Sequence, residues 1–230
     1  SSSYVVAHDV HSGKLRWKTM RMTDAMREHG DAYTTPILRR VAGRTEVVVI
    51  GGHVLDAYDP NDGRRLWYLP GLPGNRLIPS PVAAHGRIYA MTGFYDDERL
   101  LAAKVDGPVL RSRKDVVWEY DKGISDSPSP VVWGEQVYFV NNGGIARCLD
   151  ARSGELLWVK RIEGDYRASP IAAGGRIYFL NTECLTTVVK ASRSFALLAE
   201  NPLDDQAFAS PAASDGSIFI RGRKWLYCLR

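Results

Sequence analysis

Residues 59–67 read DPNDGRRLW, in which a Gly follows the Asp after four positions and a Trp follows the Gly after four more. The same spacing returns in DVHSGKLRW at residues 9–17 and in DARSGELLW at residues 150–158. A degenerate copy, KASRSFALL at residues 190–198, keeps the spacing and loses all three marker residues. Trp118 stands where a further copy is expected, behind a longer loop. Internal repetition at this scale predicts a repeat architecture.

A second signal runs in phase with the first. A Ser-Pro or Thr-Pro pair opens each repeat, and an alternating apolar stretch follows it. The pairs are Thr35-Pro36, Ser80-Pro81, Ser129-Pro130, Ser169-Pro170 and Ser210-Pro211. The apolar stretches are residues 46–50, 87–91, 136–140, 176–180 and 217–220. The period of about 40–50 residues is typical of a four-stranded propeller blade.

Each period divides into four short antiparallel strands. The first strand begins at the proline, which is tolerated there because it need not donate into the ladder. The second strand is the apolar stretch, and the third ends at the repeat Asp, whose carboxylate can accept backbone N–H groups two residues on. Gly63 and its equivalents supply the positive φ of a hairpin loop, and the fourth strand carries the Trp. The sequence therefore predicts an all-β fold, a β-propeller of four-stranded antiparallel blades.

The run AYDPNDGRRLW at residues 57–67, together with AHDVHSGKLRW at residues 7–17, resembles the tryptophan-docking motif of the pyrroloquinoline-quinone (PQQ) repeat. The resemblance covers nearly the whole chain. In that family the indole packs between adjacent blades, which suits an aromatic ring because it buries a large area. The resemblance implies a PQQ-like β-propeller in which four tryptophans are structural: Trp17, Trp67, Trp118 and Trp158.

We predict one propeller domain over residues 1–230. It is divided into a partial blade at residues 1–20, whole blades at about 33–68, 78–120, 127–160 and 167–200, and a partial blade at 208–230. Relatives of this kind usually have seven or eight blades, so the resemblance implies that the chain is the C-terminal part of an incomplete ring. The alternative is a five-bladed ring in which residues 14–18 complete the last blade.

Composition excludes several classes of protein. Of the 230 residues, 45% are hydrophobic and 24% are charged, which is the balance of a globular protein. The formal net charge is +4, but the basic residues are spread along the chain, so we predict no nucleic-acid partner. No stretch is long and apolar enough to predict a transmembrane segment. The three cysteines show no pairing or metal-ligand spacing, and we interpret each as a small apolar filler.

Quinoprotein dehydrogenases of this fold resemble one another in a Cys-Cys disulfide over the quinone, a catalytic Asp and a calcium site, where the metal acts as a Lewis acid. This sequence has no adjacent cysteines, and its five histidines share no motif. We therefore predict no catalytic residue, no cofactor and no metal site. A fragment of a quinone-dependent dehydrogenase stays open as the alternative, because the cofactor site of such an enzyme can lie in other blades.

The loops that lead into the Ser/Thr-Pro pairs offer a candidate surface. In propellers such loops converge at one end of the central channel, where ligands or partners commonly bind. Here the loops carry acidic, aromatic and Arg side chains, which suit a protein or a polar ligand. The predicted channel-mouth residues are Asp31, Tyr33, Arg76, Asp126, Asp165, Tyr166, Arg167 and Gln206. The alternative is that these are ordinary solvated loops.

Two classes of function follow from this. The first is a non-catalytic scaffold for a protein partner or ligand, which resembles the lipoprotein propellers of outer-membrane assembly. The second is the dehydrogenase fragment. Relatives of both kinds work mainly outside the cytoplasm, so the resemblance implies a periplasmic or secreted protein of the cell envelope.

Overall fold

The computed structural model describes residues 3–21, 23, 25, 32–72, 77–92, 98–105 and 112–230. Over these ranges the chain forms short β-strands and one 3-10 turn, η2 (Arg113–Asp115). The all-β fold predicted from the repeats is confirmed. The chain divides into two compact units, residues 1–121 and residues 122–230, and each is described by itself.

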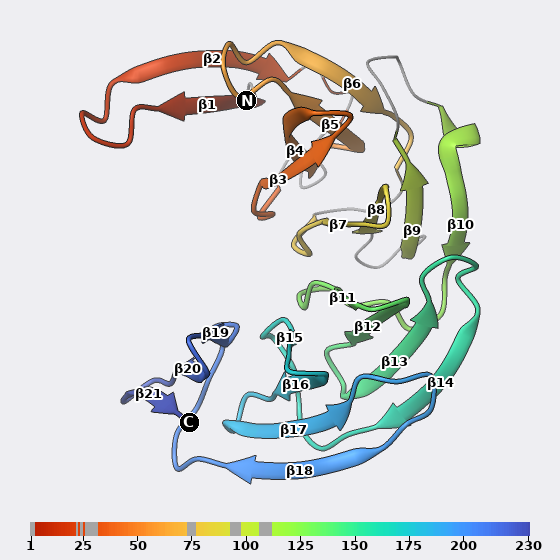
Figure 1. Cartoon of the computed structure of the whole chain (residues 1–230), viewed down its shortest axis with the longest axis vertical. Coiled ribbons are helices and arrows are strands. Elements are labelled where there is room, and N and C mark those ends of the chain that lie inside the picture. Colours follow the sequence, from red (N-terminus) through yellow and green to blue (C-terminus); the bar gives the residue numbers. More distant parts are fainter. Residues whose placement is uncertain are drawn as a thin grey trace. The chain divides into compact units, whose positions relative to one another are not determined.

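Unit 1 contains three antiparallel sheets among its described residues (Figure 1). The first has two strands, β1 (Ser3–His8) and β2 (Leu15–Arg21). The second comprises β3 (Ile37–Val41), β4 (Arg44–Gly51), β5 (Val54–Tyr58) and β6 (Arg65–Leu69). The third comprises β7 (Val82–Ala84), β8 (Arg87–Thr92), β9 (Arg99–Lys104) and β10 (Val116–Tyr120). In every sheet each strand pairs with its neighbour in the sequence.

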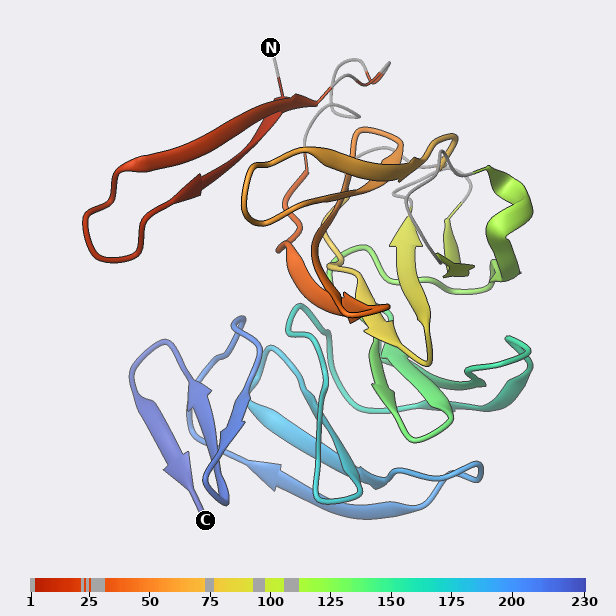
Figure 2. The ribbon, with the colours of Figure 1, turned by 45° about the horizontal axis from the view of Figure 1, so that its top comes forward.

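Unit 2 has the same architecture, and its sheets run from green to blue in Figure 2. One sheet comprises β11 (Val131–Trp133), β12 (Gln136–Val140), β13 (Ile145–Asp150) and β14 (Leu156–Arg161). The next comprises β15 (Ile171–Ala173), β16 (Arg176–Leu180), β17 (Leu185–Lys190) and β18 (Leu197–Pro202). The last has three strands, β19 (Ala212–Ser214), β20 (Ser217–Arg221) and β21 (Leu226–Leu229). These are the antiparallel sheets expected of propeller blades. Whether residues 1–230 behave as one domain stays a prediction.

The Asp-to-Gly segment forms the tight turn that its sequence predicts. The Gly63 N–H donates to the Asp59 carbonyl at 2.9 Å, and the Asp59 carboxylate accepts the Asn61 N–H at 2.9 Å. Gly63 has a φ of +74°, and a Cβ there would lie 2.4 Å from the ring of Trp17. Glycine is needed both for the backbone conformation and for the indole beside it.

The repeat tryptophans connect neighbouring sheets. Trp17 lies on β2, and its Nε1–H donates to the Pro60 carbonyl of the next sheet at 2.9 Å. Trp158 lies on β14, and its Nε1–H donates to the Ser192 carbonyl of the following sheet at 3.3 Å. Its ring meets Phe195 edge-on, with 5.2 Å between the ring centroids. Each indole therefore contributes both buried area and a hydrogen bond to a seam between sheets.

The degenerate copy departs from the predicted spacing. The hairpin between β17 and β18 is one residue longer than the hairpin between β13 and β14. Ala199 consequently pairs with β17 in the register where Trp158 pairs with β13. The sequence spacing assigned this position to Leu198, which instead lies one residue away and is half exposed. That assignment is wrong by one residue.

A buried ion pair joins two sheets of unit 1. Arg21 on β2 lies 2.9 Å from Asp56 on β5, and their side chains are 4% and 1% exposed. The Tyr58 hydroxyl donates to the same carboxylate at 2.6 Å. Burial raises the pKa of Tyr58, so the phenol stays protonated and acts as a donor. Losing either partner would leave a buried charge uncompensated.

A second buried carboxylate, Glu46 on β4, is surrounded by donors. Its carboxylate accepts hydrogen bonds from the Arg39 guanidinium at 2.8 Å, the Arg44 guanidinium at 2.5 Å and the Nε1–H of Trp67 at 2.9 Å. Desolvation opposes the charge of the carboxylate, but these hydrogen bonds outweigh it and lower the pKa of Glu46. Arg39 also donates to the Val105 carbonyl of the next sheet at 2.8 Å. Through Arg39 the cluster therefore makes a second polar contact between neighbouring sheets of unit 1.

Candidate functional site

The Ser/Thr-Pro pairs connect the first strands of neighbouring sheets. In unit 1 the Thr35 N–H donates to the Ser80 hydroxyl oxygen at 2.8 Å. In unit 2 the Ser129 N–H donates to Ser169 Oγ, and the Ser169 N–H donates to Ser210 Oγ, both at 2.9 Å. Each of these hydrogen bonds links the last residues of the loop before one first strand to the last residues of the loop before the next first strand.

The loops before the first strands are also bonded to the turns between second and third strands. The Tyr166 N–H donates to the Asn142 carbonyl at 2.9 Å, and the Thr182 N–H donates to the Asp165 carbonyl at 2.8 Å. The Ala207 N–H then donates to the Thr182 carbonyl at 3.1 Å. Loops and turns alternate in this series across the sheets of unit 2. We name it the loop end of unit 2, comprising residues 125–127, 141–144, 163–168, 181–184, 204–208 and 222–225.

The loop end brings together three exposed residues predicted from the sequence. Asp165 and Arg167 lie on the loop between β14 and β15, and Gln206 lies on the loop between β18 and β19. The Gln206 carbonyl accepts the Arg223 N–H of the adjacent turn at 2.7 Å. Their backbone is thus held by hydrogen bonds while their side chains face solvent.

Asp126 lies half-buried on the loop before β11. Its N–H donates to the Asn142 side-chain oxygen at 3.0 Å, and its carboxylate accepts the Ser127 hydroxyl at 3.0 Å. The Asn142 side-chain amide nitrogen donates to Ser127 Oγ at 3.3 Å. This local network fixes the beginning of the loop end.

Tyr166 belongs to the same loop but has no exposed surface. Its ring packs in the core between the sheets β11–β14 and β15–β18, and its hydroxyl donates to the Glu163 carbonyl at 2.9 Å. Burial raises the pKa of Tyr166 to about 12. Tyr166 is therefore a core residue that anchors its loop, and its side chain is not on the surface.

The other predicted residues belong to unit 1. Tyr33 is exposed, and its N–H donates to the Leu77 carbonyl at 2.8 Å, so its loop is anchored to the loop before β7. Asp31 and Arg76 lie outside the described residues. A role for these residues in binding stays a prediction.

Asp205 lies on a predicted channel-mouth loop but is not among the residues predicted for binding, and its bonds to a distant turn were not foreseen from the sequence. Its carboxylate accepts the N–H groups of Gln206 at 2.8 Å, Lys224 at 3.0 Å and Trp225 at 3.1 Å. Desolvation opposes its charge, but these hydrogen bonds outweigh it and lower the pKa of Asp205. A Cβ on Gly222 would lie 2.2 Å from Asp205 Oδ2, so glycine makes room for the carboxylate. Asp205 and this turn are far apart in the sequence, and no local motif links them.

The cysteines differ in their surroundings. Cys148 and Cys184 are buried, and burial raises the pKa of the Cys148 thiol to about 12, which keeps it protonated. Cys228 is exposed on β21, so its interpretation as a packed apolar filler is wrong. Across the described ranges, no three His, Cys, Asp or Glu side chains gather in a metal-ligand group. No helix in that part of the chain is long and apolar enough to cross a membrane.

The sequence profile of the family described as outer membrane protein assembly factor BamB matches residues 1–230. The chain belongs to this family. That membership confirms the resemblance to PQQ-like repeat proteins, because the residues that carry the repeat fall within the match. No curated protein matches the sequence.

Many solved structures match this chain, and two of them serve as examples of the shared fold. BamB from Moraxella catarrhalis superimposes with a TM-score of 0.70 and 13% identity, over 97% of this chain and 65% of that chain. The computationally designed protein Ika8 superimposes with a TM-score of 0.68 and 10% identity, over 97% of this chain and 64% of that chain. At these identities the likeness shows the fold alone. The chain spans about two thirds of the length of either structure.

Proposed function

We propose that this chain is a non-catalytic scaffold that binds a protein partner in the assembly of outer-membrane proteins. The proposal rests on membership of the BamB family and places the protein in the cell envelope, on the periplasmic side. The loop end of unit 2 is the proposed binding surface. The observation that carries this choice is the hydrogen-bonded series of loops and turns, which holds exposed polar side chains on a fixed backbone.

A surface of this kind favours binding for a physical reason. Association costs free energy when loops and side chains must be ordered, and a backbone that is already ordered avoids part of that cost. The exposed residues Asp165, Arg167 and Gln206 present an acid, a base and an amide on adjacent loops. Such a mixture suits a partner with complementary charges, because rim charges govern specificity and the rate of association.

The test is a double substitution, Asp165→Ala with Arg167→Ala. Both side chains are exposed, so we expect the melting temperature to stay within about 1 °C of the parent. We expect the dissociation constant for the purified partner to rise at least tenfold. The partner is first identified by photocrosslinking from position 208 of the loop end, where the exposed Phe208 is replaced, in the cell envelope fraction, and it is then purified and titrated against each variant.

Glu135 and Arg152 provide the matched control. They form an exposed acid–base pair at 2.5 Å, on turns at the other ends of the strands in the sheet β11–β14. Glu135→Ala with Arg152→Ala removes the same charges and should leave the dissociation constant unchanged. Equal binding by the loop-end variant and the parent, or equal weakening by both double variants, would show that the partner binds elsewhere.

A further inference from the structure

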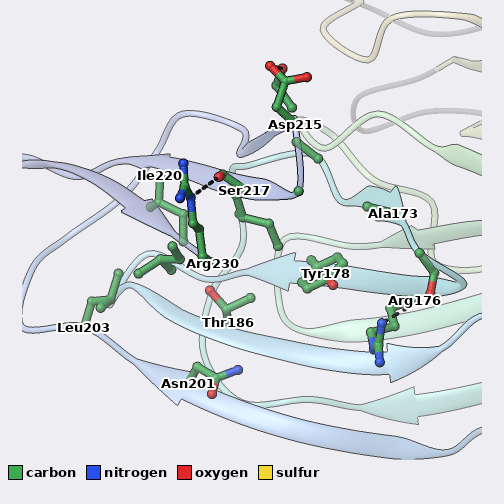
Figure 3. A pocket seen from close by; sticks show the side chains of 16 residues that line it. Ala173, Arg176, Tyr178, Thr186, Asn201, Leu203, Asp215, Ser217, Ile220 and Arg230 are labelled. Carbon is green, nitrogen blue, oxygen red and sulfur yellow. Dashed lines mark hydrogen bonds between the residues drawn. The ribbon is translucent and has the colours of Figure 1, made fainter.

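A cavity of about 800 Å³ opens between the sheets β15–β18 and β19–β21 of unit 2 (Figure 3). Its apolar wall consists of Leu203, Ile218, Ile220 and Leu229. Tyr178 on β16 lies at its edge and is partly exposed, whereas the equivalent Tyr138 of the preceding sheet is fully buried. The cavity therefore occupies a seam between sheets whose counterpart, between the sheets β11–β14 and β15–β18, is filled by the buried rings of Tyr138 and Trp158.

The preceding seam of unit 2, between the sheets β11–β14 and β15–β18, contains an aromatic side chain that the seam with the cavity lacks. There the indole of Trp158 lies 5.9 Å from the ring of Tyr138 and 5.2 Å from Phe195, measured between centroids. At the same register position β18 carries Ala199. A methyl group replaces an indole, so the face of β18 that contributes to the seam lacks the aromatic group of its neighbour. The apolar part of the cavity consequently suits an aromatic ring from a ligand.

Polar groups in the cavity wall require that the ligand also carries hydrogen-bonding atoms. Thr186 is 6% exposed, and its hydroxyl has no hydrogen-bond partner among the described residues. The adjacent lining residue Asn201 pairs with Thr186 across β17 and β18. Arg230 donates from Nε to Ser217 Oγ at 3.4 Å, which directs its guanidinium beside the apolar wall (Figure 3). The lining thus combines an apolar wall with polar side chains, which also include Arg176 and Asp215. Cavities that combine an apolar wall with placed polar groups are typical of small-ligand sites.

We propose that this cavity binds an aromatic carboxylate, either a small molecule or the C-terminal residue of a peptide. The ring lies against Tyr178 and the apolar wall, in the seam that an indole closes in the preceding pair of sheets. The carboxylate pairs with the guanidinium of Arg230, a combination that forms strong charge-assisted hydrogen bonds. The Thr186 hydroxyl bonds to a polar atom of the ligand. This site does not depend on the proposed function of the loop end.

The first experiment is a calorimetric titration of the full chain with indole-3-propionate, compared with the neutral analogue indole-3-propanol. We expect saturable one-to-one binding of the acid, and at least tenfold weaker binding of the alcohol because it lacks the carboxylate. Absence of binding by the acid at millimolar concentration would overturn the proposal. Equal affinities for the two compounds would overturn it as well, because the charge would then not be recognised.

Three variants locate the site. Arg230→Gln should weaken binding of indole-3-propionate at least tenfold, whereas the control Arg161→Gln, an exposed residue of β14 outside the cavity lining, should not change it. Ala199→Trp should fill the seam, abolish binding and raise the melting temperature. Thr186→Val keeps the shape of the wall and should weaken binding by removing the hydroxyl. If Arg230→Gln and Thr186→Val both bind like the parent, the compound binds somewhere else and the proposal is wrong.

Discussion

Trp67→Ala is the most direct test of how the sheets are held together. The indole is 2% exposed and belongs to the apolar core of unit 1. Replacing a buried aromatic residue by alanine costs about 3–5 kcal/mol. Glu46 would lose the Trp67 donor at 2.9 Å but keep Arg39 and Arg44, so we expect the total to stay within this interval. In a chain of this size the loss corresponds to a fall in melting temperature of about 6–20 °C.

Urea unfolding followed by far-ultraviolet circular dichroism measures the change. Trp67→Phe keeps a buried ring and loses the N–H, so it should cost less, about 1–3 kcal/mol. Trp225→Ala is the matched control, because that indole is 64% exposed and its removal should change stability by less than about 0.5 kcal/mol. If Trp67→Ala unfolds at the same urea concentration as Trp225→Ala, the burial of Trp67 described here is refuted.

Three further predictions follow from other contacts. Arg21→Leu leaves the carboxylate of Asp56 buried without its cation and should cost about 3–5 kcal/mol, whereas adding Asp56→Leu should recover most of the loss in the same unfolding assay. The Arg193 guanidinium, 2.6 Å away, lowers the pKa of Asp150 to about 2, below the unfolded value of about 3.9. The stability from this carboxylate is therefore complete above about pH 4 and lost as the pH falls toward 2, and Arg193→Gln should flatten the fall in melting temperature over that interval; an unchanged slope would contradict this. Calorimetric titration with PQQ and Ca²⁺ together should show no binding tighter than millimolar, and micromolar affinity would instead favour the dehydrogenase alternative.

The strand pattern could be predicted because it depends on neighbouring residues. The stretches at residues 136–140 and 176–180 are the strands β12 and β16 without any shift. Each first strand begins one residue after its proline, as β11 does at Val131, since proline cannot donate into a ladder. The turn at Asp59 and Gly63 likewise depends on local chemistry, namely a side-chain acceptor and a positive φ. Such features are readable because no distant residue is needed to produce them.

Most of the features that sequence reasoning missed depend on distant partners. The extra residue in the hairpin before β18 moves Ala199 into the position assigned to Leu198; the loss of the repeat Asp and Gly marks this hairpin as different, but it does not give the hairpin's length. Tyr166 is buried because the adjacent sheet covers it, although its sequence neighbours Asp165 and Arg167 are exposed. Asp205 bonds to a turn whose residues lie about twenty positions later. The last two cases require knowing which sheets lie side by side.

The loop end separates the groups that hold the fold from the groups that a partner can contact. Its hydrogen bonds run through backbone atoms and through buried or half-buried side chains such as Asn142 and Asp205. The Ser or Thr of each Ser/Thr-Pro pair has a fixed structural role, because its N–H or hydroxyl bonds to a neighbouring sheet. The side chain of the exposed Arg167, by contrast, donates to the carbonyl of its own neighbour Tyr166, and the exposed side chains at these positions differ from loop to loop in the sequence. Recognition can therefore change at these positions while the strands and their seams stay the same.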